Sequence, residues 1–239
     1  MTQIPAAAPA STWEDFIDIF YAPSQVFARR EQGSVWIPLV VVTLLMGTLF
    51  YLNTGALQPI FDAEFDRGMA VAVRDNPKIP PEAVERMRSV ASRIGQVGMF
   101  VFVPLAIFGV GCATWLTGKL VDAKQTFHAA LVVAAYAYVP RVLESAVNGM
   151  QGLFLDPAQL DGRFRLSLGP GRFLDPDTVS PMLLAFVGRL DLFTVWITVL
   201  IAIGLSVTGR IPLGRSAIAA ALVWLIGGLP LMFQALRAL

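Results

Sequence analysis

Residues 94–118 read IGQVGMFVFVPLAIFGVGCATWLTG, 25 residues without a single Asp, Glu, Lys or Arg. A helix of this length is long enough to cross a hydrocarbon core about 30 Å thick, because it rises about 1.5 Å per residue. Four more runs lack charge, and they are residues 32–61, 125–140, 192–209 and 216–236. The 18 basic and 17 acidic side chains all lie between or outside these runs. The pattern predicts an all-α fold, a polytopic membrane bundle of five transmembrane helices.

The overall composition agrees with a membrane protein. The chain is 56% hydrophobic and 15% charged, whereas soluble domains average about 25% charged residues. The formal net charge is +1, and no basic run is interleaved with aromatic residues, so no nucleic-acid partner is predicted. The single cysteine, Cys112, lies in a membrane run and excludes an intramolecular disulfide and thiol-pair chemistry.

The five predicted spans lie within one membrane domain, residues 32–239, at about 36–57, 94–117, 126–147, 190–209 and 216–236. Gln58-Pro59 is expected to end the first span, because proline cannot donate the helical hydrogen bond. A helix that begins at Pro81 is expected to run unbroken into the second span. The third uncharged run has only 16 residues, so its span is extended through Arg141 and Glu144.

Residues 141–190 form the longest predicted connection and contain many turn-forming dipeptides. Within it, residues 163–168 alternate polar and apolar side chains, which predicts a short strand. Ser180 and Pro181 are typical of a helix start, and the predicted helix runs through Asp191 into the fourth span.

The N-terminal region divides into two predicted parts. Residues 1–10 are rich in Ala and Pro and predict a flexible tail, and without a basic start they do not predict a cleaved signal peptide. Residues 11–31 predict an amphipathic interfacial segment, with Asp15 and the other acids on its polar face. Its apolar face has helical spacing and consists of Trp13, Phe16, Ile17 and Phe20. These side chains are expected either to anchor the segment at the lipid headgroups or to pack on the protein.

The short connections predict the orientation. Residues 118–124 and 210–215 together carry four basic residues and one acid. Positively charged short loops face the cytoplasm. We therefore expect an inner (plasma) membrane protein with a cytoplasmic N-terminus and a C-terminus outside.

Three ionisable residues at the span boundaries are candidates for a specific role. Arg141 closes the third uncharged run and Asp191 precedes the fourth, so both lie on the same side of the membrane. Arg141 and Glu144 are also neighbours on one helix face. We predict an interhelical ion-pair cluster, Arg141 with Asp191 or Glu144, that pins two helices together. The alternative is that the three residues line a proton or ion pathway.

The sequence contains no catalytic constellation that we can assemble. It has no Ser/His or paired-Asp arrangement of an intramembrane protease, no HExxH helix and no P-loop. His128 is the only histidine, which argues against a zinc site. We therefore predict no enzyme activity, no metal and no cofactor, and the identity of any ligand stays open.

Three motifs follow one another in a specific order. The first is FYAPSQVF at residues 20–27, which leads to Trp36-Ile37-Pro38. The second runs from Gly118-Lys119 to AYAYVP at residues 135–140. The third is DLFTVW at residues 191–196, followed by Gly204-Leu205 and Ser216-Ala217. With five helices, this order resembles the Yip-domain family of Ypt/Rab-interacting membrane proteins. The motif positions most typical of the resemblance are Pro23, Phe27, Tyr136, Pro140, Asp191 and Trp196.

The resemblance implies five spans and a cytoplasmic N-terminus. In eukaryotic family members it also implies vesicle traffic, with small GTPases as partners near the N-terminal region. This chain departs from that pattern, because only 35 residues precede Trp36; its loops resemble the compact bacterial members, so a small-GTPase partner is not predicted.

Taken with the absence of a catalytic motif, the resemblance favours a role in membrane organisation or as an interaction scaffold. Its partners would be the lipid bilayer and other proteins or a second copy. The alternative is a small transporter or channel in which Arg141, Glu144 and Asp191 line a polar pathway.

Overall fold

A computed structural model describes residues 11–237 as helices joined by turns, and those residues contain no strand. Five segments are long and apolar enough to cross a membrane: Trp36–Asp75, Val97–Leu120, Phe127–Phe154, Leu192–Gly209 and Leu213–Arg237. The predicted all-α bundle with five spans is confirmed. The predicted flexible tail, residues 1–10, lies outside the described residues, as do the last two residues.

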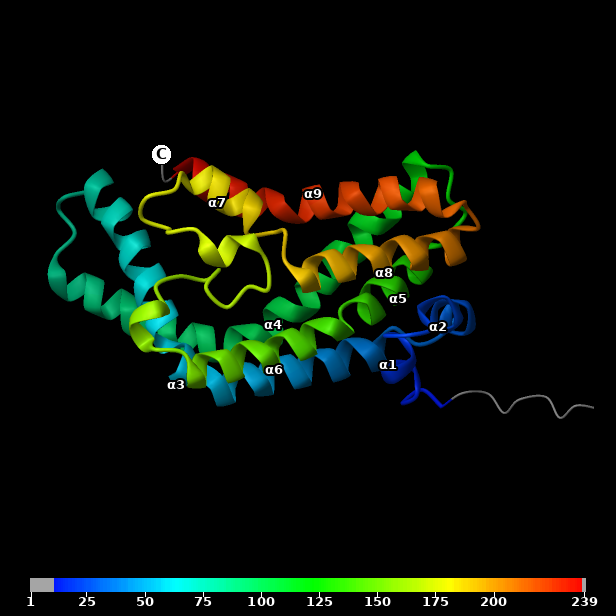
Figure 1. Cartoon of the computed structure of the whole chain (residues 1–239), viewed down its shortest axis with the longest axis horizontal. Helices are drawn as coiled ribbons and strands as arrows, with labels where there is room; N and C mark the ends of the chain where they lie inside the picture. The colour runs from blue at the N-terminus through cyan, green and yellow to red at the C-terminus, as the bar shows by residue number, and fades with distance from the viewer. Residues whose placement is uncertain (1–10, 238–239) are drawn as a thin grey trace, which may run out of the picture.

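Two long helices determine the shape of the molecule. Helices α3 (Trp36–Asp75) and α4 (Pro81–Leu120) contain 40 residues each, or about 60 Å at 1.5 Å per residue. They pack against each other and form a hairpin that projects to one side in Figure 1. We call this side of the bundle the hairpin end; it also holds residues 155–191 and the end of α9 (Leu213–Arg237). The opposite side, with α1 (Asp15–Asp18) and α2 (Pro23–Arg30), is the N-terminal end.

The helix of the first span was expected to end at Gln58-Pro59, and this is wrong, because α3 continues through Pro59 to Asp75. A proline inside a helix costs about 3 kcal/mol. Helix α3 packs along α4 and α6, and this tertiary contact offsets the missing hydrogen bond. The expected unbroken helix from Pro81 into the second span is present as α4.

The third span is two helices, where one continuous helix was expected. Helix α5 (Phe127–Ala137) ends before Tyr138, and α6 (Val139–Phe154) begins directly after it. Pro140 lies in the first turn of α6, where the absence of an N–H donor is tolerated. The same missing donor prevents α5 from continuing unchanged through Pro140.

The expected helix from Pro181 through Asp191 is also wrong. Helix α7 (Pro181–Val187) ends early, and Asp191 is the N-cap of α8 (Leu192–Gly209). The Asp191 carboxylate accepts hydrogen bonds from the first N–H groups of α8, so this residue separates two helices and does not lie inside one.

The expected strand at residues 163–168 is wrong as well. Residues 155–180 contain only turns and two short 3-10 helices, η1 (Pro157–Gln159) and η2 (Pro170–Phe173). Arg165 donates to Asp161 four residues earlier, at 2.5 Å, and to the Arg172 carbonyl. These local contacts fold the segment back on itself, and no neighbouring strand exists among residues 11–237 to pair with it.

The apolar core lies toward the N-terminal end. Helix α5 packs against α4 and α8, and residues 132–137 are at most 1% exposed. Helix α2 covers the core, with Val26 and Phe27 fully buried against it. Gly204 in α8 permits this close packing, since a Cβ there would lie 2.6 Å from a methyl group of Val133. The N-terminal end of the bundle is therefore filled with side chains.

Candidate functional site

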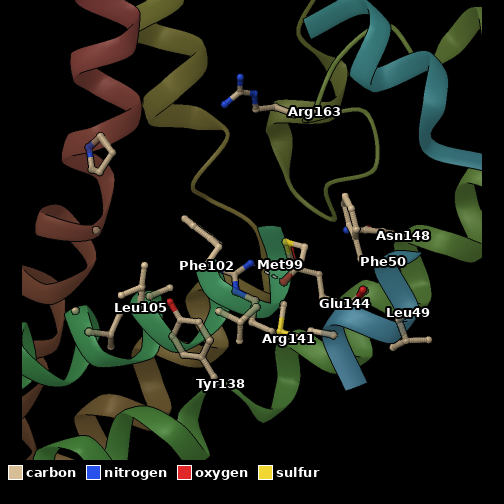
Figure 2. Close-up of a pocket in the computed structure, with 18 of the residues that line it drawn as sticks. Leu49, Phe50, Met99, Phe102, Leu105, Tyr138, Arg141, Glu144, Asn148 and Arg163 are labelled. Atoms are coloured by element: carbon tan, nitrogen blue, oxygen red, sulfur yellow. Dashed lines mark hydrogen bonds and ion pairs between the residues drawn. The ribbon is translucent and has the colours of Figure 1, made fainter. Parts of the chain in front are cut away.

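A cavity of about 840 Å³ lies between α3, α4, α6 and α9, toward the hairpin end. Figure 2 shows its walls, which are mainly apolar side chains such as Phe50, Met99, Phe102 and Leu105. Its polar lining includes Tyr138, Arg141, Glu144, Asn148, Arg163 and Arg189. The cavity therefore combines an apolar wall with a small group of charged side chains, as many ligand sites do.

Arg141 and Glu144 form an ion pair in this cavity, with a distance of 2.5 Å between guanidinium nitrogen and carboxylate oxygen. They lie one helical turn apart at the start of α6, directly after the break at Tyr138. A second Arg141 nitrogen donates to the Thr194 hydroxyl of α8 at 3.1 Å. Of the two partners predicted for Arg141, the structure has Glu144, and the link to the fourth span is made through Thr194.

Asp191 does not pair with Arg141, so this form of the predicted cluster is wrong. Its carboxylate accepts from the backbone N–H groups of Phe193 and Thr194. It also accepts from the Ser167 hydroxyl at 2.8 Å and from the Leu168 N–H at 2.7 Å. These four donors satisfy the buried carboxylate. Asp191 therefore joins the long connection to the start of α8 and does not line the cavity.

Arg189 was missed by the sequence analysis, although it lines the cavity. Its guanidinium donates to the carbonyl oxygens of Trp224 and Gly227 in α9, and it lies 5.0 Å from the centre of the Trp224 ring. The sequence contains no local signal for this contact, because its two carbonyl partners lie 35 and 38 residues further along the chain.

The N-terminal segment packs on the protein. Asp15, expected on the polar face, is fully buried and pairs with Arg29 and Arg30 of α2. The Tyr136 hydroxyl of α5 donates to the same carboxylate at 3.4 Å. The ion pairs therefore join α1 to α2 within the segment, and the Tyr136 hydroxyl connects the same carboxylate to the bundle. The predicted amphipathic helix did not include these contacts.

The four predicted interfacial anchors fall into two pairs. Phe16 packs against the Tyr136 ring and Phe20 against the Trp196 ring, with ring centres 5.9 and 5.3 Å apart. Trp13 and Ile17 are 67% and 64% exposed. Only the exposed pair is placed to contact lipid, and the other pair packs the N-terminal segment against α5 and α8.

Asp18 adds a second polar contact to this segment. Tyr21 donates to its carboxylate and Arg29 pairs with it, and both contacts hold the pKa of Asp18 below its usual range. Because this pKa is lowered in the folded protein, the contacts stabilise the segment at neutral pH. The stabilisation is lost as the pH falls through the lowered pKa.

The other family-motif positions have structural roles in the same region. Pro23 begins α2, Phe27 and Tyr136 are buried in the core, and Pro140 lies in the first turn of α6. Trp196 of α8 packs edge-on against Phe20. These motif residues thus hold the N-terminal segment, the α5–α6 break and the start of α8 in place.

Comparison with known families agrees with this arrangement. Residues 17–234 match the Yip1 domain, a range that begins in α1 and ends in α9. The chain belongs to the Yip1 domain family. The family resemblance carried by the three motifs is therefore confirmed.

This Yip1 domain protein is also similar to a bacterial membrane protein. The chain is 24% identical over 194 residues to the membrane protein YknW of Bacillus subtilis (strain 168). The aligned residues cover 81% of this chain and 78% of YknW. No solved structure matches the chain. The relative's name describes a membrane protein, in agreement with the five spans.

We expect Arg141→Gln to lower the free energy of unfolding by about 2 kcal/mol, because it leaves the partly buried Glu144 carboxylate without its partner. The measurement is thermal unfolding of the purified protein in detergent. The double variant Arg141→Gln/Glu144→Gln is the matched control, and it should recover part of the loss because no unpaired charge remains. Equal unfolding of the wild type and the single variant would show that the pair does not stabilise the bundle.

Proposed function

We propose that this Yip1 domain protein has no enzymatic activity and serves in membrane organisation or as an interaction scaffold. In this proposal it lies in the inner (plasma) membrane, with its N-terminus in the cytoplasm and its C-terminus outside. The orientation is supported by Lys119, Lys124, Arg210 and Arg215, which lie in or directly beside the two short connections between spans.

The observation that carries the scaffold proposal is the projecting α3–α4 hairpin. The membrane-spanning part of α4 begins at Val97, so the preceding turns of α4 extend beyond the bilayer. Arg88 braces the hairpin through ion pairs with Asp62 and Asp66, and its guanidinium lies 4.5 Å from the centre of the Phe65 ring. A braced pair of helices outside the membrane is a suitable element for holding a protein partner.

One face of this projecting helix is apolar and uncovered. Met87, Val90 and Ile94 follow one another at intervals of three and four residues and are 47%, 53% and 62% exposed. Apolar stripes in water are unfavourable unless another surface covers them. The exposed stripe supports contact with a protein partner. Experiment can distinguish a second copy of the chain from a different protein.

A specific observation favours the runner-up, a small transporter or channel. Arg141 and Glu144 line the cavity at membrane depth, and intramembrane charges often belong to transport pathways. Between these residues and the N-terminal end of the bundle, however, α5 fills the interior with Val132, Val133 and the neighbouring alanines, none of which is exposed. This filled core supports the scaffold proposal, because a pathway would have to pass through it.

A photoreactive amino acid at Val90 tests the scaffold proposal in native membranes. We expect irradiation to give a covalent adduct at Val90 and none at Glu85, which is also exposed but points to a different side of α4. The mass of the adduct distinguishes a second copy from another protein. If Val90 gives only the uncross-linked monomer, the stripe has no protein partner and the scaffold proposal loses its support.

A further inference from the structure

The cavity opens sideways between α4 and α9. Phe102 and Leu105 of α4 line it and are 64% and 63% exposed, and Ile226 of α9 lines it and is 43% exposed. All three residues belong to membrane-spanning segments. In Figure 1, α9 and α4 lie close together near the N-terminal end and separate toward the hairpin end. The opening therefore faces the hydrocarbon of the bilayer.

The wall of the cavity has room for a long apolar group. Gly109 lies on the cavity face of α4, and a Cβ added there would meet no atom within 4 Å. The volume of about 840 Å³ is within the range of sites for small ligands. In a bilayer, an apolar opening of this kind lies next to acyl chains, so we expect an acyl chain and not water to fill the apolar part of the cavity.

The charged lining of the cavity is not balanced. Glu144 neutralises Arg141 within the cavity, and Glu64 pairs with Arg163 from outside it. Arg189 has only the two backbone carbonyls and the Trp224 ring, and among residues 11–237 it forms no ion pair with a carboxylate. Arg189 therefore gives the cavity a net positive charge. Each terminal nitrogen of Arg189 has a second N–H beyond its bond to a carbonyl of α9, so the guanidinium can also donate to a phosphate group.

The depth of Arg189 fits a lipid headgroup. It lies two residues before Asp191, the cap at which the fourth span begins. This boundary places Arg189 near the membrane surface at the hairpin end, while Phe102 and Leu105 lie within the α4 span. One amphiphile can thus place its phosphate at Arg189 and its chain along α4.

We propose that this cavity binds an anionic phospholipid from the bilayer. The phosphate lies against Arg189, and one acyl chain enters between α4 and α9 and follows the wall past Gly109. The proposal does not depend on the scaffold role, because it concerns the cavity and not the projecting hairpin.

Native mass spectrometry of the purified full chain in detergent tests the proposal. The probes are dioleoyl phosphatidylglycerol, dioleoyl phosphatidylcholine and glycerol 3-phosphate, a soluble headgroup without chains. Both lipids carry the phosphate, but phosphatidylcholine also carries a trimethylammonium cation, which the net positive charge of the cavity disfavours. We therefore expect phosphatidylglycerol to be retained about tenfold more than phosphatidylcholine. Glycerol 3-phosphate should neither bind nor displace the lipid.

Two variants connect the binding to the cavity. Gly109→Trp should fill the space beside α4 and abolish lipid retention, whereas Gly55→Trp, at an exposed position of α3 outside the cavity, should leave it unchanged. Arg189→Gln should remove the preference for phosphatidylglycerol. If Arg189→Gln fails to fold because the α9 carbonyls lose their donor, the Gly109 and Gly55 variants still decide the question.

Three results would overturn the proposal. Equal retention of the two lipids by the wild type would exclude recognition of the anionic headgroup. Unchanged retention by Gly109→Trp would place the lipid elsewhere on the protein. Binding of glycerol 3-phosphate as strong as that of the lipid would show a soluble anion site and not a lipid site.

Discussion

Replacing Asp15 with alanine is expected to lower the free energy of unfolding by about 3–5 kcal/mol, the cost of removing one member of a buried ion pair. Asp15 is fully buried and accepts from Arg29 at 2.6 Å, and Arg30 pairs with its second oxygen. The Tyr136 hydroxyl contacts the same carboxylate. Without Asp15, the guanidinium groups of Arg29 and Arg30 each lose a carboxylate partner. The measurement is thermal unfolding in detergent, together with the yield of folded protein.

Glu14→Gln is the matched control for this variant. Glu14 is the adjacent acid and is exposed, and within residues 11–237 its side chain forms a hydrogen bond only with the Ser11 N–H. Its replacement should change stability by less than about 0.5 kcal/mol, as for most surface positions. If Asp15→Ala unfolded at the same temperature as Glu14→Gln, the N-terminal segment would not be fastened to the bundle by this carboxylate.

Replacing Asp191 with alanine is expected to cost about 3 kcal/mol. One part is the lost helix cap, about 1 kcal/mol, and the other is the loss of charge-assisted hydrogen bonds from Ser167 and Leu168, about 1.5–3 kcal/mol. Both contributions are large because the side chain is only 5% exposed. Thermal unfolding in detergent measures the total, and limited proteolysis of residues 155–180 detects release of the connection.

Ser167→Ala separates the two contributions. It removes one bond to Asp191 and leaves the cap of α8 intact, so we expect a loss of about 1 kcal/mol. An Asp191→Ala variant no less stable than Ser167→Ala would show that the cap contributes nothing. An Asp191→Ala variant with wild-type stability and wild-type resistance to protease would show that Asp191 neither stabilises α8 nor holds the connection in place.

The spans were predictable because the bilayer imposes a strict condition on sequence. Charged side chains are expensive in hydrocarbon, so the uncharged run at residues 94–118 largely coincides with the spanning part of α4, Val97–Leu120. The ends of helices were less predictable. Pro59 was expected to end α3, but packing against α4 and α6 carries the helix through it. At Pro59 the local preference of the sequence is to end the helix, and the tertiary packing keeps it intact. The sequence pattern shows the proline but not the packing.

The candidate site was predictable in part. Arg141 and Glu144 are three residues apart, so their pairing follows from helix geometry. Asp191 and Arg141 were also on the same side of the membrane, but the sequence does not show that Ser167 and Leu168 fold back to occupy the Asp191 carboxylate. Contacts between distant segments, such as Arg189 with Trp224, depend on how the helices cross and carry no local signal.

Thiol labelling from each side of the membrane tests the central claim most directly. The claim is that α5 closes the cavity at the N-terminal end, so that, apart from its lateral opening to lipid, the cavity is reached only from the hairpin end, where Arg163 lines it. The background is Cys112→Ser, since Cys112 is the only native cysteine. Asn148→Cys places a thiol in the cavity, and Lys124→Cys places one at the exposed N-terminal end. A charged, membrane-impermeant reagent is applied to right-side-out and inverted inner-membrane vesicles.

We expect the thiol at position 148 to react only in right-side-out vesicles and the thiol at position 124 only in inverted vesicles. That result agrees with a cytoplasmic N-terminus and a cavity closed on the cytoplasmic side. Reaction of position 148 in both kinds of vesicle would contradict the account, because the cavity would then be reachable from both sides, as a transporter requires.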